Sequence, residues 1–249
     1  MLKPAVVVSL ALVASMAAAQ TPPEPAPTES ELGLDPNYSR LLFAPTGRPL
    51  KKGDGYFSDY ELMFPGIAVG LTDNLSIAGG VSVIPGLRLD EQVLYVSPRI
   101  GWNLSDKAAV SAGVLYAAVP EDDGTDDLAV AFAVGTFGGR RRSLSVGLGL
   151  ADAYLPDGFN PSPIVMVGGT TTLSRHLALV SENWFALGKD FDLADQPFGL
   201  GVRFFGDRLS ADVGLVFVPE YVADGVFLPW ASISYHFGPS GAARQHRSR

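Results

Sequence analysis

The sequence contains no cysteine. This absence excludes disulfide bonds, thiolate metal sites, cysteine nucleophiles and a lipid anchor attached to a cysteine. Beyond the N-terminus there is no unbroken apolar run of about 18 residues or more, so no transmembrane helix is predicted. Charged residues make up only 18% of the chain, compared with about a quarter in a typical soluble domain. The net charge of −8 argues against nucleic acid as a partner, because phosphate binding needs a basic surface.

Residues 1–19 have the three parts of a bacterial secretory signal peptide. Lys3 supplies the positive charge, an apolar core follows, and Ala17-Ala18-Ala19 is a small-residue cleavage pattern. The mature chain is then expected to begin at Gln20. Residues 20–53 are predicted to form a periplasmic linker, because the stretch TPPEPAPTESE is Pro-rich, acidic and without apolar side chains to bury.

Residues 54–238 alternate large apolar side chains with small or polar ones in segments of about ten residues. Successive side chains of a strand point to opposite faces, so each segment is predicted to be a two-faced strand. In LAVAFAVG, residues 128–135, this rule places Val130, Phe132 and Val134 on the outer face and the alanines on the inner one. The pattern predicts an all-β fold, an up-and-down antiparallel transmembrane β-barrel of about twelve strands. The expected strands are 55–64, 67–72, 75–83, 93–104, 108–118, 128–137, 143–153, 163–173, 177–187, 197–205, 209–218 and 226–237.

The composition of the second face distinguishes a membrane barrel from a soluble one. A soluble β-sandwich or barrel would present Lys, Glu, Gln and Thr to water, whereas this face is mostly Gly, Ala and Ser, which suits a crowded barrel interior. The connections alternate between short and long, as in barrels with short periplasmic turns and longer external loops. The expected location is therefore the cell outer membrane, with lipid as a partner and both termini in the periplasm. A polar tail, residues 239–249, follows the barrel.

These features resemble the bacterial outer-membrane β-barrel proteins as a class. The segments FAPTGRPLKKGDGYF and PGIAVGLTDNLSIAGG are similar to a group of such barrels with no assigned function. In this class the last strand is the recognition signal for the barrel-insertion machinery, and it usually ends in Phe at the chain terminus. The resemblance implies that Tyr235 and Phe237 of SISYHF carry this signal here. The chain departs from the pattern by continuing after Phe237.

Several charged residues are expected on the small-residue face, inside the barrel. As a cluster they indicate either a selectivity or binding site of a channel or an internal salt-bridge network that holds the barrel closed. Because unpaired buried charge is costly, Arg203 is predicted to pair with Glu182 or Asp212. Arg99 is predicted to need a partner from the first, third or fifth strand, with Glu61 as the first candidate if the lumen is narrow. The candidate lumen residues are Asp59, Glu61, Arg99, Glu182, Arg203, Asp212 and His236.

Three functions follow from this pattern. The first is a porin-like barrel that conducts or binds small solutes, the second is a plugged barrel with a structural or surface-interaction role, and the third is a lipid-modifying enzyme. The sequence contains neither a G-x-S-x-G nor an H-E-x-x-H motif, so no catalytic residue and no cofactor is predicted and the protein is not expected to be an enzyme. Acidic long loops are expected either to be solvated or to bind divalent ions.

Overall fold

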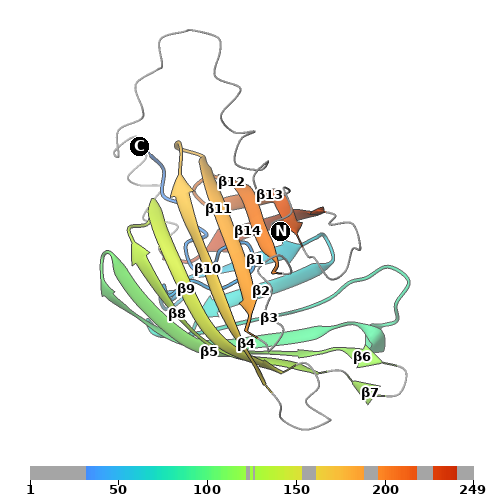
Figure 1. The fold of residues 1–249 in the computed structure, drawn as a ribbon. Coiled ribbons are helices and arrows are strands. Elements are labelled where there is room, and N and C mark those ends of the chain that lie inside the picture. Colours follow the sequence, from blue (N-terminus) through green and yellow to red (C-terminus); the bar gives the residue numbers. More distant parts are fainter. Residues whose placement is uncertain are drawn as a thin grey trace, which may run out of the picture.

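A computed structural model describes residues 32–121, 124–125, 127–152, 161–187, 196–217 and 227–239. The predicted signal peptide, and the tail from residue 240 on, lie outside these residues. Twelve strands form a closed antiparallel ring in which each strand pairs with its neighbours along the chain, and β1 closes the ring against β14 (Figure 1). The predicted all-β, up-and-down barrel is confirmed. Its strands are β1 (Gly55–Tyr60), β2 (Phe64–Gly70), β3 (Leu75–Val81), β4 (Leu94–Ser105), β5 (Ala108–Ala118), β8 (Leu128–Gly138), β9 (Arg142–Asp152), β10 (Ser162–Thr172), β11 (Leu177–Ala186), β12 (Phe198–Phe205), β13 (Leu209–Phe217) and β14 (Phe227–Phe237).

The first two strands differ most from their predicted bounds. The chain leaves β1 after Tyr60 and turns through Glu61 and Leu62, whose φ angles are 55° and 58°. It enters β2 at Phe64, so that Pro65 lies within a strand instead of between the two predicted strands. The long connections also contain elements that were not predicted: a short 3-10 helix, η2 (Leu89–Glu91), and a two-stranded ribbon of β6 (Pro120–Glu121) and β7 (Gly124–Thr125).

The outer surface of the ring is apolar. Leu148, Leu200 and Val213 are exposed over 63%, 57% and 57% of their surface, and their neighbours on the same face are also large and apolar. A soluble monomer rarely exposes such a continuous apolar patch, but it is the surface that the hydrocarbon of a bilayer requires of a barrel. Among the described residues, no helix has the length and hydropathy needed to span a membrane.

Strand β8 reverses the predicted faces. Val134 is buried inside the ring, and Phe132 on the same inner face packs against the same cluster, whereas Ala131 and Ala133 face outward. The prediction that the larger residues of this strand face lipid is therefore wrong. The physical reason is that the interior holds apolar side chains from elsewhere in the chain, and Val134 packs against them.

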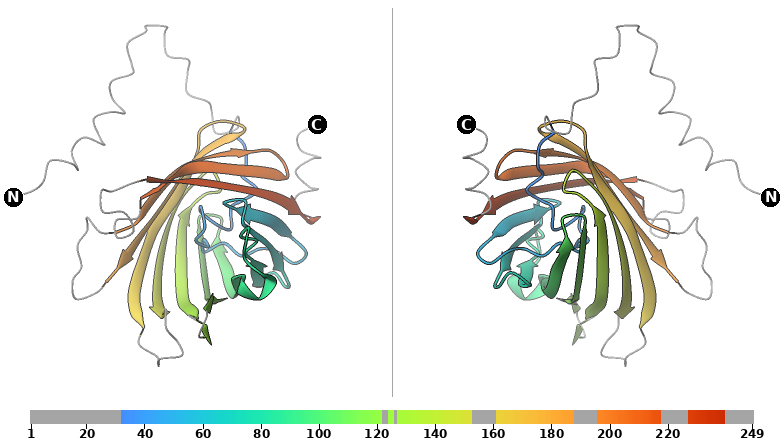
Figure 2. Two further views of the ribbon diagram at one scale, coloured as in Figure 1. Left: turned by 90° about the vertical axis from the view of Figure 1, so that its right-hand side faces the viewer. Right: turned by 90° about the vertical axis from the view of Figure 1, so that its left-hand side faces the viewer.

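Those side chains belong to residues 32–53, which we call the plug. Figure 2 shows this segment, in blue, running inside the ring of strands. It forms a hairpin-like bend in which the Leu41 N–H donates to the Ala44 carbonyl at 2.8 Å and the Thr46 N–H to the Ser39 carbonyl at 2.9 Å. We predicted a periplasmic linker for residues 20–53; from residue 32 on, the structure places this segment in the lumen instead.

Candidate functional site

The plug bends at Leu41 and Leu42, which are almost completely buried against the inner wall of the barrel. They pack with Val134 of β8, Met166 of β10 and Val180 of β11. Glycines of the wall make room for them. A Cβ atom at Gly168 would lie 2.5 Å from Leu41 Cδ1, and one at Gly201 would lie 3.0 Å from Leu42 Cδ2. The small residues of the inner face thus receive the plug's apolar side chains.

Arg203 on β12 connects this wall to the plug and has no solvent-exposed surface. Its Nε and Nη2 donate to the two oxygens of Asp212 on β13, at 2.5 and 3.0 Å. Its Nη1 donates to Asp35 Oδ2 of the plug at 2.9 Å, and its Nη2 also donates to the Leu41 carbonyl at 2.6 Å. The predicted contact of Arg203 with Asp212 is present, and Asp35 is a second carboxylate partner that the sequence did not indicate.

Arg40 of the plug shares the same carboxylate. Its Nη1 lies 3.3 Å from Asp212 Oδ2, and its Nη2 donates to Ser234 Oγ at 2.9 Å. Its guanidinium also lies 5.0 Å from the centroid of the Tyr60 ring, a cation–π distance. Two arginines and two aspartates are therefore buried together, with each charge opposed, which is the condition under which buried ions are tolerated.

Glu182 on β11 holds the tip of the plug through its backbone. One carboxylate oxygen accepts the N–H groups of Phe43 and Ala44, both at 2.9 Å, and the other accepts the Trp184 indole N–H at 2.9 Å. The carboxylate satisfies two backbone donors that would otherwise be buried without a partner. Glu182 is thus occupied by the plug, and its predicted pairing with Arg203 is not made.

Arg99 on β4 contacts the plug from the opposite wall. Its Nη1 donates to the carbonyls of Ser39 and Thr46, both at 3.1 Å, and its Nη2 donates to the Arg48 carbonyl at 3.4 Å. The predicted pair with Glu61 is not formed, because Glu61 lies in the β1–β2 turn, where its carboxylate accepts the Ala231 N–H at 2.8 Å.

The short turn after β8 anchors the base of the plug. Arg140 donates to the Asp35 carbonyl at 3.1 Å and stacks over the Tyr38 ring at 4.2 Å, while Arg141 donates to the Leu32 carbonyl at 3.0 Å. Arg48 of the plug donates to the Gly138 carbonyl at 2.5 Å, and burial holds the pKa of Arg48 below its ordinary value. Both ends of the plug thus lie at the short-turn end of the barrel.

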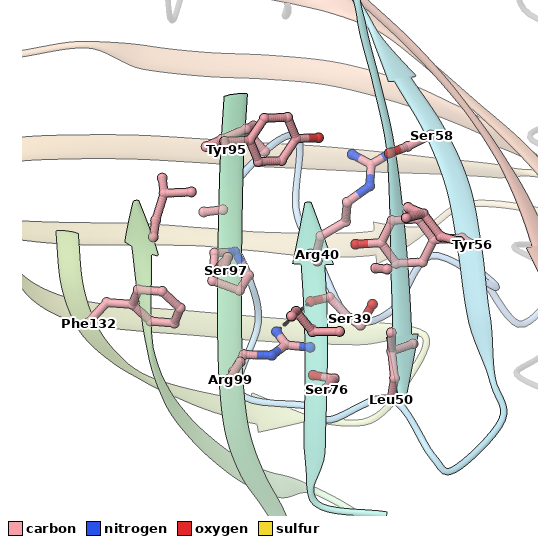
Figure 3. A pocket seen from close by; sticks show the side chains of 18 of the residues that line it. Ser39, Arg40, Leu50, Tyr56, Ser58, Ser76, Tyr95, Ser97, Arg99 and Phe132 are labelled. Atoms are coloured by element: carbon pink, nitrogen blue, oxygen red, sulfur yellow. Dashed lines mark hydrogen bonds between the residues drawn. The ribbon is translucent and has the colours of Figure 1, made fainter. Parts of the chain in front are cut away.

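A cavity of about 130 Å³ remains between the plug and the wall formed by β1 to β5. Its described lining is mostly apolar, with the hydroxyl groups of serines and tyrosines and two arginines among it, and it includes no acidic residue. Figure 3 shows Tyr56, Tyr95 and Ser97 of the wall around this space, with Arg40 and Ser39 of the plug and Arg99 of β4. Gly66 and Gly80 leave room for the Tyr95 hydroxyl, since a Cβ at either would lie 2.2 or 2.6 Å from it.

The remaining predicted lumen residues divide into two groups. His236 lies inside, 6% exposed, with its ring centroid 5.3 Å from that of Tyr56. Asp59 does not point into the lumen: it pairs across the sheet with Ile233 on the outer face, and its carboxylate accepts the Phe64 N–H at 3.2 Å. The assignment of Asp59 was wrong because Tyr56 and Tyr60, large residues with a polar tip, occupy the inner face of β1.

Tyr235 lies on the outer face of β14, 48% exposed, and the Phe237 ring packs against that of Phe57, with centroids 5.2 Å apart and the ring planes tilted by 44°. Their role as a barrel-insertion signal stays a prediction. Most acidic residues of the long loops lie outside the described residues. Within the described part of the chain, no group of His, Asp and Glu side chains is arranged to hold a metal ion.

The ring of strands is similar to solved porin structures. A KdgM porin, solved in complex with disordered oligogalacturonate, matches with a TM-score of 0.51 at 7% identity, over 75% of this chain and 98% of that chain. A NanC porin matches with a TM-score of 0.45 at 11% identity, over 74% of this chain and 97% of that one. No protein-family model matches the chain, and no curated protein matches it at a significant level. The predicted membership of the outer-membrane β-barrel class is confirmed at the level of the fold.

Proposed function

We propose that this outer-membrane β-barrel protein admits small solutes into its lumen, through a space that the plug narrows. The observation that carries the proposal is the cavity beside the plug. The tip of the plug packs against β10, β11 and β12, and leaves a space on the β1 to β5 side lined by Tyr56, Tyr95 and Ser97. A mostly apolar and aromatic lining that carries a few hydroxyl and guanidinium groups is typical of a site for a small solute.

The location is the outer membrane, with the short turns on the periplasmic side. The apolar outer face of the ring is the argument for a membrane location. The difference in length between the two sets of connections is the argument for the orientation. Both ends of the plug are at the short-turn end, so in this orientation the plug enters the lumen from the periplasm.

A second function is favoured by a different observation. The ion pairs of Arg203 and Arg40 with Asp35 and Asp212 tie the plug firmly to the wall. A lumen held shut by such a network would belong to a barrel with a structural role, as the sequence also allowed. Conductance distinguishes the two functions, because a structural barrel passes no ions.

The test measures conductance in planar bilayers with single engineered cysteines. The chain has no native cysteine, so a substituted thiol is the sole target of a membrane-impermeant methanethiosulfonate reagent. Ser97→Cys places the thiol on the cavity wall, whereas Ser145→Cys places it under the plug, where Ser145 is completely buried and bonded to Thr136. We expect a measurable conductance that the reagent lowers in Ser97→Cys and not in Ser145→Cys.

Two outcomes contradict the proposal. Absence of conductance in the unmodified protein would support the structural role. Conductance that the reagent leaves unchanged in Ser97→Cys would show that solutes pass elsewhere.

A further inference from the structure

The cavity beside the plug has an unbalanced charge. Two arginines line it, and its described lining contains no acidic residue. Arg40 is neutralised, since Asp212 lies 3.3 Å from its Nη1. Arg99 forms no ion pair with any carboxylate of the described residues, although it is only 8% exposed. No carboxylate in direct contact therefore balances its positive charge.

The contacts of Arg99 position the guanidinium without neutralising it. Its three hydrogen bonds all go to carbonyl oxygens of the plug, which are dipoles and carry no net charge. A guanidinium has five N–H donors, so two of them have no acceptor among the described residues. A buried cation without a counter-charge is costly, and a bound anion would remove this cost. Figure 3 shows the guanidinium held at the edge of the plug, beside the space that Ser76 and Ser97 line.

The carboxylates nearest to this site are already engaged. Glu182 accepts three N–H groups, and Asp35 and Asp212 are paired with Arg203 and Arg40. Glu182 keeps its negative charge, because its three donors are neutral, but it forms no ion pair with Arg99. Asp59 and Glu61, which were expected inside, lie on the outer face and in the β1–β2 turn. Among the described residues, no carboxylate thus lies within ion-pair distance of Arg99.

We infer that the cavity binds a small hydroxylated carboxylate, with its carboxylate on Arg99 and its hydroxyl groups on the serines and tyrosines of the wall. The cavity of about 130 Å³ has room for a short-chain hydroxy acid, which makes such a molecule a suitable probe. The charge-assisted bonds of an arginine to a carboxylate are stronger than hydrogen bonds between neutral groups. We therefore expect the negative charge of the ligand to contribute more to binding than its hydroxyl groups do. This inference rests on the proposed function, because it names the solute class of the same cavity.

The experiment is calorimetric titration of the full chain in detergent at low ionic strength, with L-lactate as the probe. Glycerol is the matched neutral solute, with a similar size and more hydroxyl groups. We expect lactate to bind and glycerol to bind at least about tenfold more weakly, because one charge-assisted hydrogen bond contributes about that factor or more. Equal binding of the two solutes, or binding of neither, would overturn the inference.

Two substitutions separate the charge of Arg99 from its support of the plug. Arg99→Lys keeps the charge and loses the planar fork, whereas Arg99→Gln keeps a hydrogen-bond donor and loses the charge. We expect Arg99→Gln to weaken lactate binding about tenfold to a hundredfold and Arg99→Lys to weaken it less. Equal losses in both variants would mean that Arg99 only positions the plug, and the inference would be wrong.

Glycerol-induced swelling of liposomes that contain the protein separates this inference from the proposed function. Swelling together with absent or charge-independent lactate binding would overturn the inference and leave the proposed function standing. Lactate binding without swelling would support an anion site in a closed barrel, and would contradict the proposed passage of solutes.

Discussion

At the scale of single residues, the interior of the barrel follows one rule: each buried charge is opposed by another charge or held by backbone groups. Arg203 was predicted to need a carboxylate from an adjacent strand, and Asp212 supplies it directly across the ladder. That pairing was predictable because both residues lie on the same face of neighbouring strands. The partners of Arg99 were not, because they are carbonyls of a segment that the strand pattern does not include.

The charge of Asp35 is expected to keep the plug in place. Its Oδ2 pairs with Arg203, and its Oδ1 accepts the Asn37 N–H at 2.8 Å. Removing one partner of a buried ion pair destabilises a structure by about 3–5 kcal/mol. We expect Asp35→Ala to expose the plug to trypsin at Arg40 and Arg48 while the barrel stays folded, as judged by its mobility in unheated gels.

The matched control for Asp35→Ala is Asp90→Asn. The ion pair of Asp90 with Arg88 spans 3.2 Å, but both side chains are exposed, and such pairs contribute about 0–1 kcal/mol. This variant should leave the plug as resistant to trypsin as it is in the unmodified protein. The same cleavage rate in both variants would show that Asp35 does not hold the plug.

At the scale of elements, the strands were predictable and the plug was not. From β3 onward the expected strand ends lie close to the observed ones, because each strand carries its own alternation and is bounded by turn residues. The plug has no such period. Its apolar run Leu41-Leu42-Phe43 is short and follows a Pro-rich stretch, and its structure depends on contacts with strands far away in sequence. One signal was present: an inner face with so many glycines must be filled from elsewhere.

The fit between the plug and the wall is open to a paired test. A side chain at Gly201 would meet Leu42 Cδ2 3.0 Å from the new Cβ, and overpacking of this kind costs about 1–3 kcal/mol. We expect Gly201→Val to loosen the plug, measured as faster amide hydrogen exchange in residues 39–46. Leu42→Ala alone leaves a cavity in the apolar cluster and should also loosen the plug, because such a substitution costs about 2–5 kcal/mol of stability.

The double variant Gly201→Val with Leu42→Ala is the decisive member of this set. The added valine would occupy the space that the leucine leaves, so the two effects should be strongly non-additive, as they are for residues in contact. Amide exchange of residues 39–46 in the double variant should be slower than the rate expected if the effects of the two single substitutions added. Strict additivity would mean that Gly201 and Leu42 do not meet in the folded protein.

At the scale of the whole molecule, the two ends of the barrel differ. The plug enters and leaves at the end with the short turns, where Gly33 donates to the Ser174 carbonyl and Gly53 to the Gly70 carbonyl. At the opposite end lie the longer connections, among them the β6–β7 ribbon. The two entrances to the lumen therefore differ: a solute that arrives from the long-loop side meets the tip of the plug first.

The orientation of the barrel in the outer membrane can be tested with epitope tags. Short turns are expected in the periplasm and long connections outside, so an epitope tag inserted between Gly124 and Thr125 should bind antibody on intact cells. A tag after Asp106, in the turn between β4 and β5, should bind antibody only after the outer membrane is permeabilised. Labelling of the Asp106 tag on intact cells, with the Gly124 tag silent, would reverse the orientation and place the plug and its anchoring arginines at the cell surface.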